Sequence, residues 1–513
     1  MNRIQFIGIK LIALFAVISL AQVTIVCQSL SARDRVSVKD FGAVGNGKAD
    51  DTKAIQAAID RVASSGGGIV FFPSGNYKVT IDPSTSRAIT IRSRITLQGE
   101  GHKNSIIKLE HQGNYTAILT GEALASDLSG FAMYDLAIDG NATKNPVKSL
   151  SDFEDEKRRF ALRIYVGTGI SIERCRFTNQ SNANTVTTNG EAVSDVQIKN
   201  NVFELIGGDP IDYDHSTIYA HGQRIQISNN SFKSKNGAGT KAARTAIETH
   251  GDDYIVNGNF ISGYTNGIYV TGYARSSERQ NVTHNTIKNA YTGITVWSYF
   301  YPGNKTNPGL MHSRIANNEI HLDINGWRSL WGDSPSAGIA LESNSEATVK
   351  NLHIVGNRIR FTNFSGTSRS SDNLASGISM WRYAAPKVLS EGIYILNNTI
   401  ENSLGSGMYI VMPIKTGRIW QNTIVNPGQS QGSFHKDYRS GIILGSSFED
   451  VQINRNLLID NQRINTMTAG IIGNADCIAN CEARGNSLQV SSGATLELFR
   501  PKSGTRNAFN VSP

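Results

Sequence analysis

One stretch of the chain is rich in side chains that can exchange protons or hold charge. Six of them are candidates for acid–base chemistry: His215, Tyr219, His221, Arg244, Glu248 and His250. Clustered titratable groups shift one another's pKa values, and aromatic rings stack on sugar rings. These residue types therefore predict acid–base chemistry on a saccharide.

The candidates can be aligned through a recurring Gly-Ile phrase that predicts one strand of each repeat. Aligning Ile218 with Ile247 and its later equivalents, and letting side chains alternate along each strand, gives two outward rows. The first row is Tyr219, Glu248, Tyr269, Thr295, Ala340 and Ser379, and the second is His221, His250, Thr271, Trp297, Glu342 and Trp381. The same alignment puts His215 beside Arg244. Neighbours within a row should lie roughly 4.8 Å apart.

Aromatic and polar residues on the same face are candidates for substrate binding. They are Tyr269, Tyr273, Trp297, Glu342, Trp381 and Arg382. The alternative is that the outward residues form only cross-strand pairs, as on any sheet. Solvated faces usually carry Lys, Glu, Ser and Thr, so the His, Tyr and Trp content favours a functional face.

Three acids in the adjoining turn, Asp209, Asp212 and Asp214, form a candidate Ca²⁺ site. Acidic residues are also common in turns, because their side chains hydrogen-bond to the backbone. A purely structural role of these acids in the turn is therefore the alternative interpretation. The segment lacks the glycine and downstream glutamate of an EF-hand loop, which excludes that type of site. Ca²⁺ is the one cofactor that the sequence suggests.

A second repeated phrase runs from about residue 161 to 490. An alternating apolar strand ends in Asn-Asn or Gly-Asn, as at Val196–Asn201, Ile225–Asn230 and Tyr394–Asn398, with spacings of about 25 to 45 residues. Such repeats are typical of solenoids. Like residues stack in a solenoid, so we expect the turn asparagines to hydrogen-bond along the stack. The sequence predicts an all-β, right-handed parallel β-helix.

The start of the chain predicts a cap for this solenoid. Ile55, Ala58, Ile59 and Val62 recur at helical spacing, so residues 52–64 should form an amphipathic helix with Asp50 or Asp51 as N-cap. A buried strand at 69–73 and a turn at 75–77 should follow. The helix could cover the apolar end of the first coil.

This opening resembles the N-terminal segment of the pectate lyase superfamily, which includes bacterial polysaccharide enzymes and phage tailspikes. The matching residues are Asp40–Ala43, Gly45, Gly47, Asp50–Thr52, Ala54, Ile55, Ala58, Ile59, Gly67, Gly68, Phe72, Pro73, Gly75 and Tyr77. The resemblance implies a β-helix, but members differ in chemistry. We expect a cap and first coils at 33–100, coils with the groove at 101–490, and a tail at 491–513 that covers the far end.

Residues 1–32 read as a signal peptide, with Arg3 and Lys10 before an apolar run and small residues after it. We expect cleavage, no stable membrane insertion afterwards, and a secreted, periplasmic or cell-surface protein. A retained anchor, or a lipid on Cys27, is the alternative. Cys477 and Cys481 are close enough to pair on a turn, whereas Cys175 lies in an apolar strand and should be a buried thiol.

The chain carries a net charge of +8, or +6 without residues 1–32. This mild basicity favours an anionic polysaccharide as partner. The basic residues are too diffuse for a nucleic-acid partner. The resemblance to tailspikes, many of which trimerise, implies a homotrimer as one form of assembly.

Four activities fit these residues. A lyase would remove the proton α to a uronate carboxylate, with Arg244 neutralising the carboxylate, His250 or His221 as base, and Tyr219 or Tyr269 as acid. A glycoside hydrolase would instead use two carboxylates, such as Glu248 and Asp252. We rank the lyase first, the hydrolase second, and a non-catalytic, adhesin- or tailspike-like glycan binder third.

A uronate C5-epimerase would use the same groups as the lyase. Asp209-Pro210-Ile211-Asp212 resembles the Asp-Pro-His-Asp motif of alginate epimerases, although Ile211 replaces the histidine of that motif. The sequence lacks the Asn-Thr-Asp, paired-Asp and Gly-His-Gly motifs of polygalacturonases, which argues against that family.

Overall fold

A computed structural model describes most of the chain. The described residues are 34–110, 115–146, 159–180, 184–206, 216–234, 243–273, 277–299, 309–324, 336–343, 348–363, 374–382, 390–430, 438–473, 476–491, 496–501 and 510–512. The expected signal peptide at 1–32 lies outside them.

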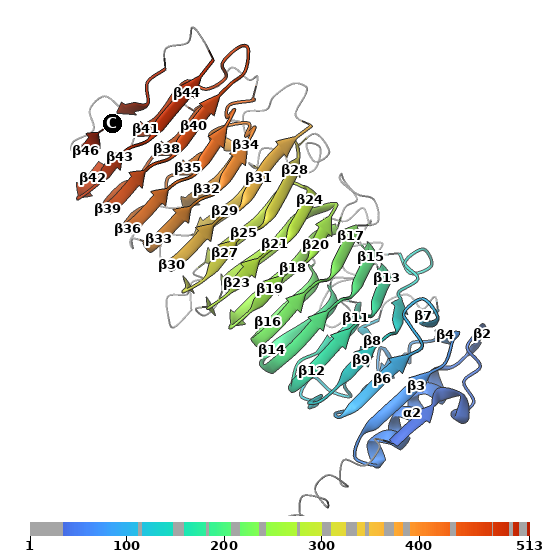
Figure 1. Ribbon diagram of the computed structural model, residues 1–513. Helices are drawn as coiled ribbons and strands as arrows, with labels where there is room; N and C mark the ends of the chain where they lie inside the picture. The colour runs from blue at the N-terminus through green and yellow to red at the C-terminus, as the bar shows by residue number, and fades with distance from the viewer. Residues whose placement is uncertain are drawn as a thin grey trace, which may run out of the picture.

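The described residues form an elongated stack of coils, as the sequence predicts (Figure 1). Each complete coil contributes three strands, and successive coils pair in parallel. Two of the three strand rows join into one large sheet, and the third row forms a second sheet. The molecule is a right-handed parallel β-helix, and the predicted fold class is confirmed.

The first row of strands carries the candidate site. Its members are β5 (Arg87–Thr90), β8 (Ala117–Thr120), β11 (Phe160–Ile164), β14 (Asn184–Lys199), β16 (Ser216–Ser228), β18 (Ala243–Asp252), β21 (Tyr264–Tyr273), β25 (Thr292–Tyr299), β29 (Ala337–Ser343), β32 (Ser376–Arg382), β35 (Met408–Ile410), β38 (Ser440–Leu444), β41 (Ala469–Gly473) and β45 (Phe499–Pro501).

The second row follows each of these strands after a bend. It contains β1 (Asp34–Ser37), β3 (Gly68–Phe72), β6 (Ile95–Gly99), β9 (Ala132–Tyr134), β12 (Gly167–Glu173), β19 (Ile255–Asn257), β23 (Asn281–Thr283), β27 (Arg314–Ala316), β30 (Thr348–Val355), β33 (Ser390–Leu396), β36 (Ile414–Trp420), β39 (Ser447–Asn454), β43 (Glu482–Arg484) and β46 (Asn510–Ser512). Strands β14 and β16 are long enough to belong to both rows.

The third row forms the second sheet. Its strands are β2 (Asn46–Asp50), β4 (Gly75–Val79), β7 (Ser105–Leu109), β10 (Ala137–Asp139), β13 (Arg176–Gln180), β15 (Val202–Ile206), β17 (Ser231–Ser234), β20 (Phe260–Ser262), β24 (Thr286–Ala290), β28 (Glu319–Asp323), β31 (Arg358–Thr362), β34 (Thr399–Glu401), β37 (Thr423–Val425), β40 (Leu457–Asp460) and β44 (Ser487–Val490). The turn predicted at 75–77 is wrong, because these residues begin β4. Its side chains alternate between the core and the surface, as strand residues do.

The Gly-Ile phrase has a packing cause. A Cβ on Gly338 would lie 2.6 Å from the carbonyl oxygen of Gly377 in the next coil and would collide with Ile359 of the third row. The following Ile339 is fully buried in the core. Each phrase therefore fixes which residues of its strand point inward.

A ladder of buried asparagines runs along one turn of the solenoid. It consists of Asn201, Asn230, Asn259, Asn285, Asn318, Asn357, Asn398, Asn422, Asn456 and Asn486. Each side-chain amide donates to a backbone carbonyl and, except for Asn486 at the end of the ladder, to the Oδ1 of the next coil's asparagine at 2.9–3.0 Å. The predicted stacking of asparagines is confirmed.

The N-terminal cap also forms. Helix α2 (Thr52–Ser64) buries Ile55, Ala58, Ile59 and Val62, as predicted, and it lies at the first coil in Figure 1. Asp51 occupies the N-cap position, but its side chain makes no capping hydrogen bond. Its carboxylate instead accepts from the backbone N–H groups of Val44 and Gly45, while Asp50 accepts from Thr52 N.

The cysteines behave as the sequence predicts. Cys477 and Cys481 form a disulfide, and Cys175 is a buried free thiol. Beyond them, β45 pairs with β41 and β46 pairs with β43. The described residues of the tail thus extend the large sheet.

Candidate functional site

The predicted alignment of the site strands agrees with the observed register. Tyr219 pairs with Glu248, and His221 pairs with His250. Further along, Glu248 pairs with Tyr269, Thr271 with Trp297, and Trp297 with Glu342, which pairs with Trp381. Both outward rows therefore run unbroken across the strands from β16 to β32.

The outward rows are only partly open to solvent. The large side chains, such as Tyr219, His250 and Trp297, are half-buried. The small ones between them, Thr271, Thr295, Ala340 and Ser379, are buried. The large groups thus rise above a floor of small residues.

His250 is held by hydrogen bonds on both sides of its ring. Nε2 lies 2.8 Å from Oε1 of Glu248, two residues earlier in β18. Nδ1 lies 2.7 Å from the hydroxyl of Thr271 in β21. The other carboxylate oxygen of Glu248 accepts a hydrogen bond from the hydroxyl of Ser216 in β16. One polar chain therefore links three successive coils.

Glu248 is a charged group in a protected position. Burial opposes its ionisation, but hydrogen bonds from His250 and Ser216, together with the positive charges of His250 and Arg244, outweigh burial. The pKa of Glu248 is consequently held below its usual value. The residue is a carboxylate at neutral pH.

Tyr219 and His221 flank His250 from the preceding coil. The Tyr219 ring lies over the His250 ring, with centroids 4.7 Å apart, and the His221 ring centroid is 5.9 Å from that of His250. Nδ1 of His221 lies 3.3 Å from Oδ1 of Asn189 in β14. Because an amide oxygen only accepts, this contact places the proton of a neutral His221 on Nδ1 and its lone pair on Nε2.

A buried tyrosine supports the backbone beneath this cluster. The hydroxyl of Tyr254 lies 3.0 Å from the carbonyl oxygen of Ala220 and 3.1 Å from that of His250. It ties the strands that carry His221 and His250 to one point in the core.

The candidate binding residues continue the face toward the C-terminus. The rings of Tyr269 and Trp297 have centroids 6.4 Å apart. Trp381 and Glu342 are half-buried on the next coils. Tyr273 and Arg382 lie in strands with the predicted register, opposite Tyr299 and Ser343.

Four predicted residues, His215, Asp209, Asp212 and Asp214, lie outside the described residues. Their roles and the Ca²⁺ site stay predictions. Within the described part of the chain, no group of three or more His, Cys, Asp or Glu side chains is arranged to hold a metal ion.

Sequence reasoning did not assign a role to Asn189, Ser216 or Thr271. Asn189 could have been found, because Val186 takes the place of the aligned isoleucine and pairs with Ile218. The roles of Ser216 and Thr271 depend on side-chain orientation, which the pattern of residues does not specify.

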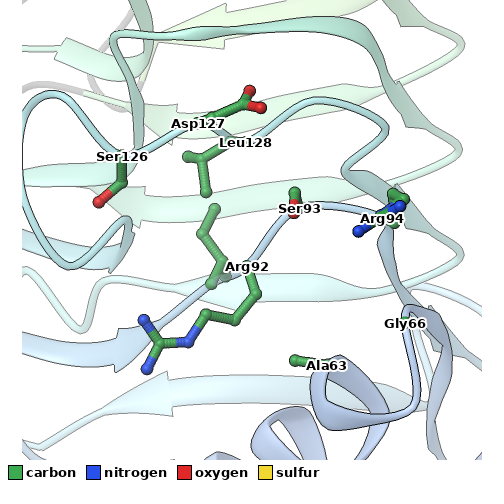
Figure 2. A pocket seen from close by; sticks show the side chains of 9 residues that line it. Ala63, Gly66, Arg92, Ser93, Arg94, Ser126, Asp127 and Leu128 are labelled. Carbon is green, nitrogen blue, oxygen red and sulfur yellow. The ribbon is translucent and has the colours of Figure 1, made fainter.

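A surface hollow near the cap lies away from this cluster. It is lined by Ala63, Gly66, Ile91, Arg92, Ser93, Arg94, Ser126, Asp127 and Leu128 (Figure 2). Arg92 forms ion pairs with Asp60 and Glu122. Its positive charge is therefore matched locally, and the hollow is a junction between helix α2 and the first coils.

Among the residues that the structure describes, no helix is both long enough and apolar enough to cross a membrane.

Comparisons with known proteins fit this architecture. Residues 35–213 match the family model "Rhamnogalacturonase A/epimerase, pectate lyase-like", and residues 164–325 match a family described as a protein of unknown function. The resemblance of the opening to the pectate lyase superfamily is thus confirmed.

Several curated relatives come from Azotobacter vinelandii. Mannuronan C5-epimerase AlgE3 is 44% identical over 110 residues, covering 20% of this chain and 6% of that protein. Mannuronan C5-epimerase AlgE2 is 31% identical over 258 residues, covering 45% and 25%. Alginate lyase 7 is 43% identical over 109 residues, covering 20% and 12%. The chain spans a quarter or less of the length of these relatives.

Among solved structures, the chain resembles a tailspike protein mutant of E. coli bacteriophage HK620 in complex with pentasaccharide. The TM-score is 0.61 at 15% identity, and the alignment covers 90% of this chain and 79% of the tailspike. At this identity the likeness supports the β-helix fold alone.

Proposed function

We propose that the protein is an exported polysaccharide lyase that cleaves a uronate-containing polymer by β-elimination. The observation that carries this proposal is the grouping of Tyr219, His221 and the Glu248–His250 pair on one outward face of the sheet. The relatives support a polysaccharide substrate, since they include enzymes named for acting on mannuronan and alginate.

Each step has a candidate residue. Arg244 neutralises the uronate carboxylate, which makes the α proton more acidic. Nε2 of His221 removes this proton, because its Nδ1 is oriented by Asn189. The hydroxyl of Tyr219 then protonates the leaving glycosidic oxygen. The products are an unsaturated uronate and a new reducing end.

The geometry favours this assignment over His250 as the base. Both ring nitrogens of His250 are within hydrogen-bonding distance of protein groups, namely Glu248 and Thr271. Tyr219 and His221 are two residues apart on one strand, so they lie about 6.6 Å apart on the same side of the sheet. Acid and base thus approach the sugar from one side, as a syn elimination requires.

Epimerisation at C5 is the second candidate, because several relatives are mannuronan C5-epimerases. It shares proton removal by His221 but returns the proton to the opposite face of the ring. That step needs a proton donor on the other face of the sugar ring, opposite His221.

Hydrolysis has less support among the described residues. Glu342 lies three coils from Glu248, or about 14 Å along the solenoid, beyond the spacing of glycosidase carboxylates. The carboxylate of Asp252 accepts a hydrogen bond from the backbone N–H of Glu278 in the short strand β22 (Ser277–Glu278).

The test is incubation of the protein with alginate, polygalacturonate and other anionic polysaccharides. Ultraviolet absorbance of the unsaturated product should rise together with new reducing ends, and His221→Ala should strongly slow the appearance of both. New reducing ends without this absorbance would show that the enzyme is a hydrolase and not a lyase. A change in uronate composition without cleavage would identify an epimerase, and no reaction on any polymer would favour a glycan-binding protein.

A further inference from the structure

The hydroxyl of Thr271 makes two contacts that constrain the protonation of His250. It lies 2.8 Å from the carbonyl oxygen of Thr249 and 2.7 Å from Nδ1 of His250. A carbonyl oxygen only accepts, and a hydroxyl has one proton to donate. With the hydroxyl donating to Thr249, the Thr271 oxygen accepts from Nδ1 of His250, which then carries a proton.

The other side of the ring faces a carboxylate. Nε2 of His250 lies 2.8 Å from Oε1 of Glu248, with both side chains largely shielded from solvent. A bare lone pair on Nε2 would face a negative oxygen at this distance, so a proton has to lie between them. The hydrogen bond from Ser216 to Glu248 and the nearby charge of Arg244 favour the carboxylate, so the proton belongs to Nε2.

We propose that Thr271 is a positioning residue that holds His250 as a doubly protonated cation, ion-paired with Glu248, beneath the ring of Tyr219. This inference rests on the proposed function for its catalytic consequence. A fixed positive charge 4.7 Å from the phenol, measured between ring centroids, stabilises negative charge on Tyr219. Tyr219 can then give up its proton to the leaving oxygen while His221 acts as base.

The neighbourhood of His250 contains several titratable groups that any test has to consider. They are Glu248 and Arg244 on its own strand, Tyr219 and His221 on β16, and Tyr269 on β21. Thr271 carries no charge. Changing Thr271 therefore alters the hydrogen bonding of His250 without replacing any titratable side chain of the cluster.

The first measurement needs no substrate. In protein labelled with ¹⁵N-histidine, the His250 resonances, assigned by comparison with His250→Gln, should have the shifts of two protonated ring nitrogens at neutral pH. In Thr271→Val, which keeps the shape and removes the acceptor, the ring should lose proton occupancy. Thr271→Ser should restore the wild-type spectrum. Thr265→Val changes a buried threonine of the same strand and should leave it unchanged.

A neutral His250 in the wild type, or an unchanged His250 spectrum in Thr271→Val, would overturn the inference. The second measurement is kinetic. Thr271→Val should lower kcat about tenfold with little change in KM and shift the pH profile of kcat, and Thr271→Ser should recover both. Loss of the lyase reaction in every polymer assay would reject the proposed function while leaving the spectroscopic result intact.

Discussion

Asn189 and His221 face each other across two successive coils, with Oδ1 of the amide 3.3 Å from Nδ1 of the ring. The contact fixes which ring nitrogen can accept a proton from substrate. We expect His221→Ala to lower kcat by about 10²- to 10⁴-fold, the usual contribution of a general base. Asn189→Ala should lower kcat less, since the His221 ring remains but is no longer oriented. Steady-state kinetics on an active polymer would measure both, and equal losses in the two variants would argue against an orienting role.

The Glu248 carboxylate should make stability depend on acid pH. Its pKa is lowered in the folded protein, so its contribution is fully present above the ordinary glutamate value of 4.5. The contribution is lost as the pH falls from there through the lower folded value. Between pH 7 and pH 3, the midpoint temperature of thermal unfolding should therefore fall less steeply for Glu248→Gln than for the wild type. Parallel curves would mean that Glu248 is not linked to folding.

The asparagine ladder should be costly to interrupt. Asn357→Ala removes the acceptor of the backbone N–H of Asn318 and the donor to the carbonyl of Ile315. Losing these hydrogen bonds, together with those to the side chains of Asn318 and Asn398, in a buried ladder should lower the free energy of unfolding by roughly 3 kcal/mol or more. The exposed Asn281 provides a control, since Asn281→Ala should change stability by about 0.5 kcal/mol or less. Denaturant unfolding of both variants tests this expectation.

Trp297 and Trp381 should bind polymer rather than take part in chemistry. Replacing either by alanine should raise KM for long substrates about threefold to tenfold, because each stacking contact contributes about 0.5–1.5 kcal/mol. The kcat for short oligosaccharides that end near Glu248 should stay unchanged. If short and long substrates lose equally, the two rings instead support the fold of the face.

The proposed Ca²⁺ site at Asp209, Asp212 and Asp214 can be tested by chelation. Activity should fall after treatment with EDTA, and CaCl₂ should restore it more effectively than MgCl₂, because Mg²⁺ demands near-ideal octahedral geometry and loses its water reluctantly. Asp212→Asn should weaken the response to CaCl₂. Full activity in EDTA would favour the turn interpretation of these acids.

The register of the site strands was accessible from the sequence because packing dictates it. Gly293 and Gly338 stand where a Cβ would collide with the neighbouring coil, and the isoleucine after each is buried. Because the same steric requirement recurs in every coil, the Gly-Ile phrase recurs in the sequence and shows how the strands align. The pairings of Tyr219 with Glu248 and of His221 with His250 follow directly.

The hydrogen bonding within the site was not accessible in the same way. The contacts of His250 with Glu248 on its own strand and with Thr271 in the next coil depend on side-chain torsions. The alternation of side chains along a strand does not specify these torsions. Asp51 illustrates the same limit at the cap. Its place before the helix is predictable, but its carboxylate turns to the backbone of Val44 and Gly45.

Helix α2 has a further consequence for assembly. In a parallel β-helix every coil is a template for another, so an uncovered terminal coil invites edge-to-edge growth into fibres. By lying across the apolar interior of the first coil, Ile55, Ile59 and Val62 make that end unable to template a second molecule. The helix thus prevents a second molecule from extending the solenoid at this end. A fold whose coils could otherwise stack without limit is in this way kept to one chain there.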